Sequence, residues 1–164
     1  MLHESDETYI LDLMAHSSQS VKIRDGMLDV KRLLRTDSNA LELWEPVVKA
    51  RFPLERKEVA AIFELPSELT RESYTFEQFI ADVVAPRPWL RLVEVHKSRR
   101  SFTCAECLAE FVEVRADAAS LQSFALEHED AKRLLRTLQM LGLDPRANTN
   151  YVLGLKRALG LECA

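Results

Sequence analysis

The sequence has no apolar run of about 18 residues, which is the length that a membrane-spanning helix needs. Its first residues, MLHESDE, are acidic and lack the apolar core of a secretory signal. We therefore expect neither a membrane span nor a signal peptide.

Cysteine is scarce, with Cys104, Cys107 and Cys163 as the three copies. An odd count without a secretion signal is typical of a reducing compartment, so we predict a cytoplasmic protein. The CAEC stretch from Cys104 to Cys107 could be half of a zinc site or a redox pair, but neither a second CxxC nor a His pair at finger spacing accompanies it. If this stretch is a strand, the two cysteines point to opposite faces, and we interpret them as structural.

Glycine and proline are also few, with 4 and 6 copies, so no long linker is evident. A chain of 164 residues suits one domain with a sizeable core, and we predict a single domain over residues 1–164. Positive charge is not in excess, since 22 Lys and Arg stand against 26 Asp and Glu for a net charge of −4. This balance disfavours a nucleic-acid partner, and any basic site must be local.

The pattern along the chain predicts an α+β fold with a largely antiparallel sheet. The strongest local signal is Asp25-Gly26, a two-residue hairpin turn between two strand-like segments. Thr75 with Gln78, and Asp130, are typical helix starts, while a last helix starts at Asn148 or Asn150. The expected strands are 7–14, 20–24, 27–35, 41–52, 90–104, 108–116 and 120–129, and the expected helices are 55–65, 75–84, 130–141 and 148–159.

The hairpin has one charged face and one apolar face. Because side chains alternate across a strand, Val21, Ile23, Leu28 and Val30 share the apolar face. The charged face carries Lys22, Arg24, Met27, Asp29 and Lys31. Later strands repeat the pattern, with the pairs Lys49 and Arg51, Lys97 and Arg99, Glu106 and Glu110, and Glu127 and Glu129.

Two interpretations of these faces remain open. An antiparallel sheet with one side in water has the same alternation. However, the early strands are basic and the late strands are acidic, whereas a solvated face mixes signs. The amphipathic helices also need an apolar sheet face to cover, which would turn the charged face inward. A charged lining is costly unless a ligand neutralises it, so it favours a polyanion held by Arg and Lys, with Mg²⁺ or Mn²⁺ held by carboxylates.

The ordered set of charged residues resembles the CYTH superfamily, the triphosphate tunnel metalloenzymes. The family's first-strand motif ExExK matches Glu4, Asp6 and Thr8, with threonine in place of the lysine. Arg24 and Lys31, with Lys22 beside them, match its basic residues on strands two and three. The segment HKSRRSF supplies a basic pair, LAEFVEV supplies Glu110 or, by parity, Glu106, ALEHED supplies an ExE pair, and NTNYVLGLK is similar to the family's last helix.

The resemblance implies an antiparallel β-barrel or tunnel of about eight strands, with a charged interior and helices packed outside. It implies a metal-dependent phosphohydrolase, a triphosphatase using Mg²⁺ or Mn²⁺, that acts on a polyphosphate or nucleoside triphosphate, with Glu127 and Glu129 as catalytic residues. The implied metal ligands are Glu4, Asp6, Glu110, Glu127 and Glu129. The implied phosphate-binding residues are Lys22, Arg24, Lys31, Lys49, Arg51, Lys97 and Arg99. Many barrels of this sort pair up, so a homodimer is a further expectation.

Other functions remain open beside the triphosphatase. Thr8 in place of the motif lysine favours a catalytically degenerate protein that binds a nucleotide or polyphosphate without turnover, unless Lys22 or Lys49 fills the gap. A class IV adenylate cyclase-like enzyme is a further alternative. A different class of protein, an open-sheet scaffold whose charged face meets a protein partner, would show the same alternation.

Overall fold

The fold is a curled antiparallel sheet with a few short helices, described by a computed structural model over residues 2–14, 18–62 and 69–161. Seven strands follow the order β4-β3-β2-β1-β7-β8-β9, and a separate pair, β5 and β6, forms a small second sheet. The strands are β1 (Leu2–Asp12), β2 (Gln19–Arg24), β3 (Met27–Thr36), β4 (Glu42–Arg51), β5 (Leu54–Glu55), β6 (Ser73–Tyr74), β7 (Leu90–Cys104), β8 (Cys107–Ala116) and β9 (Ala119–Glu127). The helices are α1 (Arg56–Ala60), α2 (Phe76–Gln78), η1 (Phe79–Val84), α3 (Ala131–Met140), η2 (Pro145–Ala147) and α4 (Tyr151–Ala158).

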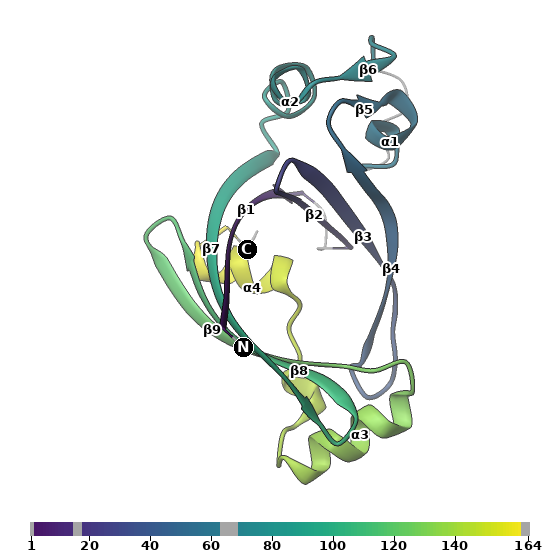
Figure 1. The fold of residues 1–164 in the computed structure, drawn as a ribbon, viewed down its shortest axis with the longest axis vertical. Coiled ribbons are helices and arrows are strands. Elements are labelled where there is room, and N and C mark those ends of the chain that lie inside the picture. Colours follow the sequence, from purple (N-terminus) through teal and green to yellow (C-terminus); the bar gives the residue numbers. More distant parts are fainter. Residues whose placement is uncertain (1, 15–17, 63–68, 162–164) are drawn as a thin grey trace.

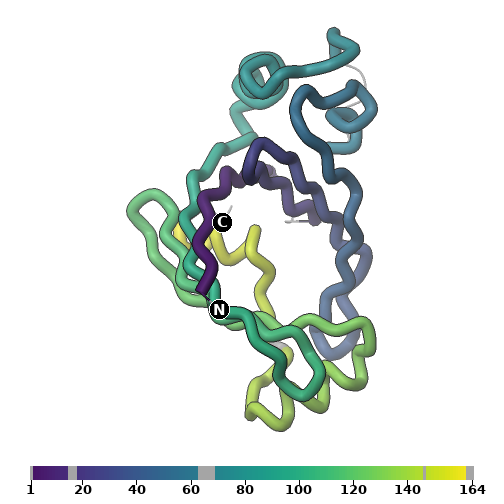
Figure 2. The backbone as a smooth tube through the Cα atoms, in the orientation of Figure 1, coloured from purple at the N-terminus to yellow at the C-terminus, as the bar shows by residue number. Residues whose placement is uncertain are grey.

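Figure 1 shows that the large sheet is strongly curled, so that one of its faces is concave and the other is convex. The N-terminal strand β1 stands at the centre of the sheet, between β2 and β7, and joins two three-stranded meanders (Figure 2). The predicted α+β class with an antiparallel sheet is confirmed. The sheet has two ends, β4 and β9, so strand pairing among the described residues does not close it into the expected barrel of about eight strands.

Two hydrophobic cores lie on opposite faces of the sheet. The first packs Val21, Ile23 and Leu28 against Val59 of α1 and Phe79 of η1, so these helices cover the convex side. The second lies on the concave side, where Val152 and Leu155 of α4 pack against β1, β7 and β8. Helix α4 therefore lies within the curl of the sheet (Figure 1), which corrects the expectation that the helices pack outside it.

The capping residues begin the helices as the sequence predicts. The Thr75 side chain accepts a hydrogen bond from the Gln78 amide, and the Gln78 side chain completes the capping box. Asp130 caps α3, and Asn150 rather than Asn148 caps α4. Each cap satisfies amides that have no partner within the helix. The helix expected over 55–65 is shorter, since α1 ends at Ala60, and its last three residues lie outside the described part.

The CAEC stretch is a hairpin turn rather than a strand, which corrects the expected placement of its cysteines. Cys104 and Cys107 are direct partners across the turn, so they share a face instead of pointing apart. Both are free thiols, and the Cys107 Sγ lies 3.3 Å from the Thr137 hydroxyl of α3. Cys163 lies outside the described residues.

None of the described helices is long and apolar enough to cross a membrane.

The turn between β7 and β8 gives a prediction about stability. Ala105 and Glu106 both have positive φ, of 47° and 67°, as Asp25 and Gly26 do in the first hairpin, with φ of 51° and 68°. A non-glycine residue in this region costs about 1–2 kcal/mol, and glycine costs about 0.4–1 kcal/mol through the freedom of the unfolded chain. We expect Ala105→Gly to raise the free energy of unfolding by up to about 1 kcal/mol in urea titrations. Ala125→Gly, in the middle of a strand, is the matched control and should lower it.

Candidate functional site

The concave face of the sheet carries a line of charged residues that crosses β2, β1 and β7. The register opposes Tyr9 to Lys22, Ser5 to Lys97, and Glu7 to Val95. Opposed residues of an antiparallel pair point to the same side, so Glu7, Lys22 and Lys97 share the concave face with Tyr9. This is the face against which α4 packs.

Glu7 is the centre of this cluster, with a side chain that is fully buried. Its Oε2 lies 2.9 Å from the Lys97 Nζ and 4.0 Å from the Lys22 Nζ. Its Oε1 accepts hydrogen bonds from Arg99 and, at 3.4 Å, from Arg24. One carboxylate is therefore surrounded by four cations from two other strands. We call these five residues the Glu7 cluster.

The attraction of the cations determines the ionisation of Glu7. Burial alone would raise its pKa, but the positive charges of Lys97, Lys22 and Arg99 outweigh burial and lower the pKa to about 2. Burial lowers the pKa of Lys97 to about 8, against the opposing attraction of Glu7. At neutral pH the cluster therefore holds four positive charges against one negative charge, with Asp29 as a further acid 3.6 Å from Lys22.

Two tyrosines enclose the ammonium group of Lys97. It donates a hydrogen bond to the Tyr9 hydroxyl at 2.7 Å and lies 3.9 Å from the centre of the Tyr151 ring. An ammonium over an aromatic face is attracted by the ring quadrupole. Because the Tyr151 hydroxyl also bonds Ser123 of β9, α4 ties the Glu7 cluster to the far strand of the sheet.

A second polar group lies at the edge strand β4. The Glu42 carboxylate accepts from the Trp44 indole at 2.9 Å and from the Asn150 side chain at 3.0 Å. Asn150 is the N-cap of α4 and directly precedes Tyr151, which contacts Lys97. The start of α4 therefore connects this polar group to the Glu7 cluster. The indole is thereby held in one orientation on the concave side.

The structure brings together four of the seven expected phosphate-binding residues. Lys22 and Arg24 lie partly exposed at the rim of the Glu7 cluster, with 18% and 37% of their side chains accessible. Lys97 and Arg99 lie beneath them and are buried. The remaining three, Lys31, Lys49 and Arg51, are exposed on β3 and β4, where Lys49 opposes Asp29 and Arg51 opposes Met27 of the charged hairpin face.

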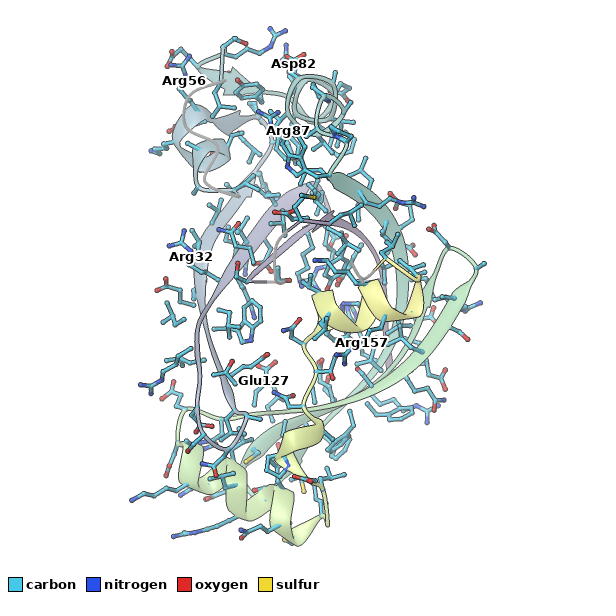
Figure 3. The ribbon with its side chains drawn as sticks, turned by 180° about the vertical axis from the view of Figure 1, so that it is seen from behind. Arg32, Arg56, Asp82, Arg87, Glu127 and Arg157 are labelled. Carbon is cyan, nitrogen blue, oxygen red and sulfur yellow. The ribbon has the colours of Figure 1, made fainter. Side chains whose placement is uncertain are left out.

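The expected acidic ligands are not gathered in one place. The Glu110 carboxylate accepts a hydrogen bond from Ser101 on the concave face. Glu127 is the last residue of β9 and lies on the concave side of the sheet (Figure 3). Glu129 follows the end of β9. Glu4 and Asp6 are exposed, and Asp6 bonds His96 at 2.8 Å on the convex face, away from Glu7. Thr8 shares this outer face and bonds Glu94, so the motif lysine that it replaces would also point away from the cluster.

The expected Mg²⁺ or Mn²⁺ would need several carboxylates close together beside the basic residues. Among the residues that the structure describes, no group of three or more His, Cys, Asp or Glu side chains is placed to hold a metal ion. The carboxylate nearest to the basic residues, Glu7, is already neutralised by them, so it is not a free ligand. The donor set therefore does not fit a resident Mg²⁺ or Mn²⁺ at the Glu7 cluster.

Glu7, Tyr9 and Tyr151 were not predicted as site residues from the sequence. On β1 the matched motif placed the functional residues at Glu4, Asp6 and Thr8, one position out of phase with Ser5, Glu7 and Tyr9, which face the concave side. The residues of β1 that face the concave side could have been recognised from its pairing with the strands that carry Lys22 and Lys97, because these cations require an acid on the same face.

No protein-family model matches the chain, and neither a curated protein nor a solved structure matches it. The resemblance to the triphosphate tunnel metalloenzymes therefore stays a prediction.

The ionisation of Glu7 predicts how acid acts on stability. Its folded pKa of about 2 lies below the usual value of 4.5, so its stabilising contribution is complete above pH 4.5 and is lost as pH falls towards 2. The difference corresponds to about 3 kcal/mol, at about 1.36 kcal/mol per pKa unit. We expect Glu7→Gln to be less stable at pH 7 and to lose less stability between pH 4.5 and 2 than wild type in denaturant titrations. Parallel losses in the two proteins would contradict the assignment.

Proposed function

We propose that this protein binds a polyphosphate-type anion, a nucleoside triphosphate or inorganic polyphosphate, on the concave face of its sheet. The observation that carries the proposal is the Glu7 cluster, in which four cations surround one carboxylate and two of them reach the surface. Arg presents a fork to phosphate oxygens and Lys a point charge. Exposed Lys31, Lys49 and Arg51 extend the same basic face.

The buried carboxylate explains how so many cations are held before a ligand arrives. Unpaired buried charge is very costly, and Glu7 offsets it for Lys97 and Arg99. Of the three positive charges that are left over, two lie at Lys22 and Arg24, which retain access to solvent. A phosphate chain would therefore bind along Lys22, Arg24 and the exposed cations of β3 and β4, above Glu7.

Binding is the first prediction of this proposal. Tripolyphosphate at about 100 times its dissociation constant should stabilise the protein by about 2.7 kcal/mol, visible as a higher Tm. Arg24→Met should weaken binding about tenfold to a hundredfold, because a charge-assisted hydrogen bond contributes about 1.5–3 kcal/mol. Arg100→Met is the matched control, because it removes the same charge from the outer face. Arg100 is exposed there and lies opposite Leu2 and Phe111.

Equal weakening by Arg24→Met and Arg100→Met, measured by calorimetric titration, would mean that only net charge matters and would contradict a site on the concave face. The absence of any shift with tripolyphosphate, ATP or longer polyphosphate would favour the open-sheet scaffold instead.

The pH dependence of binding tests the part that Lys97 plays. Its pKa of about 8 means that the free protein loses this charge as pH rises through 8, so affinity for the anion should fall there. Lys97→Arg keeps the charge at all accessible pH values and should remove the step. The comparison of the two profiles cancels the ionisation of the ligand itself. Identical profiles would exclude Lys97 from the binding site.

Hydrolysis of the bound anion is the second candidate function. Glu110 and Glu127 share the concave side with the basic residues, and their strands are paired, with Leu108 opposite Glu127 and Ala125 opposite Glu110. Two carboxylates on one face near a phosphate chain are what a divalent cation bridging protein and phosphate requires. In this candidate the basic residues orient the phosphate chain, and Glu110 and Glu127 would hold a cation that would supply stabilisation of negative charge on the phosphoryl group.

Turnover is tested by phosphate release from tripolyphosphate with Mg²⁺ or Mn²⁺. Metal-dependent release that Glu127→Gln abolishes, and that the matched outer-face variant Glu113→Gln preserves, would support the triphosphatase. Binding without release at either metal would support the degenerate binder, with Glu7 acting only as the internal counter-ion.

A further inference from the structure

The strand β9 is an open edge of the seven-stranded sheet. It pairs with β8 on one side, and within the described residues no hydrogen bond joins the backbone of Ala119–Glu127 to any other element. An edge of this kind presents a row of free N–H and C=O groups.

The register identifies which residues present those groups. Ala116 and Ala119 flank a two-residue turn, and such flanking residues exchange both hydrogen bonds. Hydrogen-bonded and non-bonded pairs alternate along an antiparallel ladder, so the odd-numbered residues of β9 bond β8. The backbone groups of Ser120, Gln122, Phe124 and Leu126 therefore point outward along the free edge.

The two edges of the sheet differ in protection. The β4 edge contains Pro46, Glu45 and Lys49 within ten residues and two register shifts against β3, all of which oppose further pairing. The β9 segment 119–126, ASLQSFAL, has neither proline nor a charged side chain. One edge is thus blocked and the other is a template for another strand.

Exposed aromatic side chains adjoin the unprotected edge. Phe124 is 40% exposed and Phe102 is 47% exposed, and their ring centres lie 6.3 Å apart on the outer face. Leu2, also exposed, lies on the same outer face, opposite Arg100 of β7. Apolar surface next to an open strand is typical of a protein interface rather than of a solvated edge.

We propose that two copies of this chain associate by antiparallel pairing of β9 with β9, about a two-fold axis at Phe124. An uncharged strand meets its own copy without repulsion, although each chain carries a net charge of −4. Acidic residues stand at both ends of the strand, at Asp117 and at Glu127 and Glu129. A two-fold axis at Phe124 opposes Glu127 to Leu121 and Glu129 to Ala119, whereas an axis at Gln122 would oppose Glu127 to Asp117.

The pairing stops at two copies. A two-fold axis uses the same edge of both chains, so the interface is closed and the outer edges of the joint sheet are the two protected β4 strands. The Phe124 side chains of the two copies become direct cross-strand neighbours, and aromatic pairs of this kind stabilise sheets. The inference does not depend on the proposed binding function, because the concave face and the β9 edge are separate surfaces.

The test compares two phenylalanines that touch each other but differ in their distance from the edge. Sedimentation in the micromolar range should give twice the mass of one chain for wild type. Phe124→Lys should give the mass of one chain, because it places a charge on the free edge. Phe102→Lys lies on β7, two strands from the edge, and should leave the dimer intact.

Circular dichroism melts of the variants establish that each is folded. If Phe124→Lys fails to fold, Gln122→Pro replaces it, since it removes an outward N–H and leaves the bonds to β8 in place. A monomeric wild type would overturn the proposal. Equal dissociation by Phe102→Lys and Phe124→Lys would also overturn it, because it would show that the chains associate through the outer face and not through the β9 edge.

Crosslinking tests the register. In a background with Cys104, Cys107 and Cys163 replaced by serine, Phe124→Cys should form an intermolecular disulfide on mild oxidation. Gln122→Cys should not, because the two-fold axis at Phe124 separates residue 122 from its copy by four residues, about 13 Å along the strand at about 3.3 Å per residue. Crosslinking at 122 in preference to 124 would overturn the two-fold axis at Phe124.

Discussion

The attraction between Glu7 and the cations around it is the interaction on which the concave side of this protein depends. Three strands meet at that carboxylate, with β1 contributing the acid, β2 contributing Lys22 and Arg24, and β7 contributing Lys97 and Arg99. Without the acid, Lys97 would be an uncompensated ammonium among buried side chains, which is far more costly than an exposed one. The same interaction sets the geometry of Tyr9 and Tyr151, since both rings take their place around the Lys97 ammonium.

Much of the scaffold follows from local patterns in the sequence. Asp25-Gly26 predicts the first hairpin because glycine tolerates positive φ, and alternation then puts Lys22 and Arg24 on one face. The Thr75, Asp130 and Asn150 caps follow from side chains that bond the first free amides of a helix. These features are determined within a few residues, and so they can be recognised without the rest of the chain.

The centre of the candidate site could not be predicted in this way. Tyr9, Ile10 and Leu11 are all buried, because β1 lies in the middle of the sheet with cores on both faces. Where both faces of a strand are buried in apolar cores, the alternation of residues does not show which side chains point to which face. The motif match then assigned the site to Glu4 and Asp6 instead of Glu7. The contribution of Tyr151 depends on how α4 lies in the curl of the sheet, and that position is set by tertiary packing rather than by residues near it in sequence.

The central position of β1 also has a consequence for how the chain folds. The meanders β2-β3-β4 and β7-β8-β9 are built from neighbouring hairpins, whose contacts form early because little chain must be ordered. The join between β1 and β7 is different, since Glu7 and Arg99 are 92 positions apart along the chain. Each doubling of a closed loop adds only about 0.6 kcal/mol of entropy cost, but the whole cost precedes the contacts that offset it. The zipping of β1 onto β7 is therefore the step that we expect to limit the folding rate, and the β7 edge of the second meander stays unpaired until that step is complete.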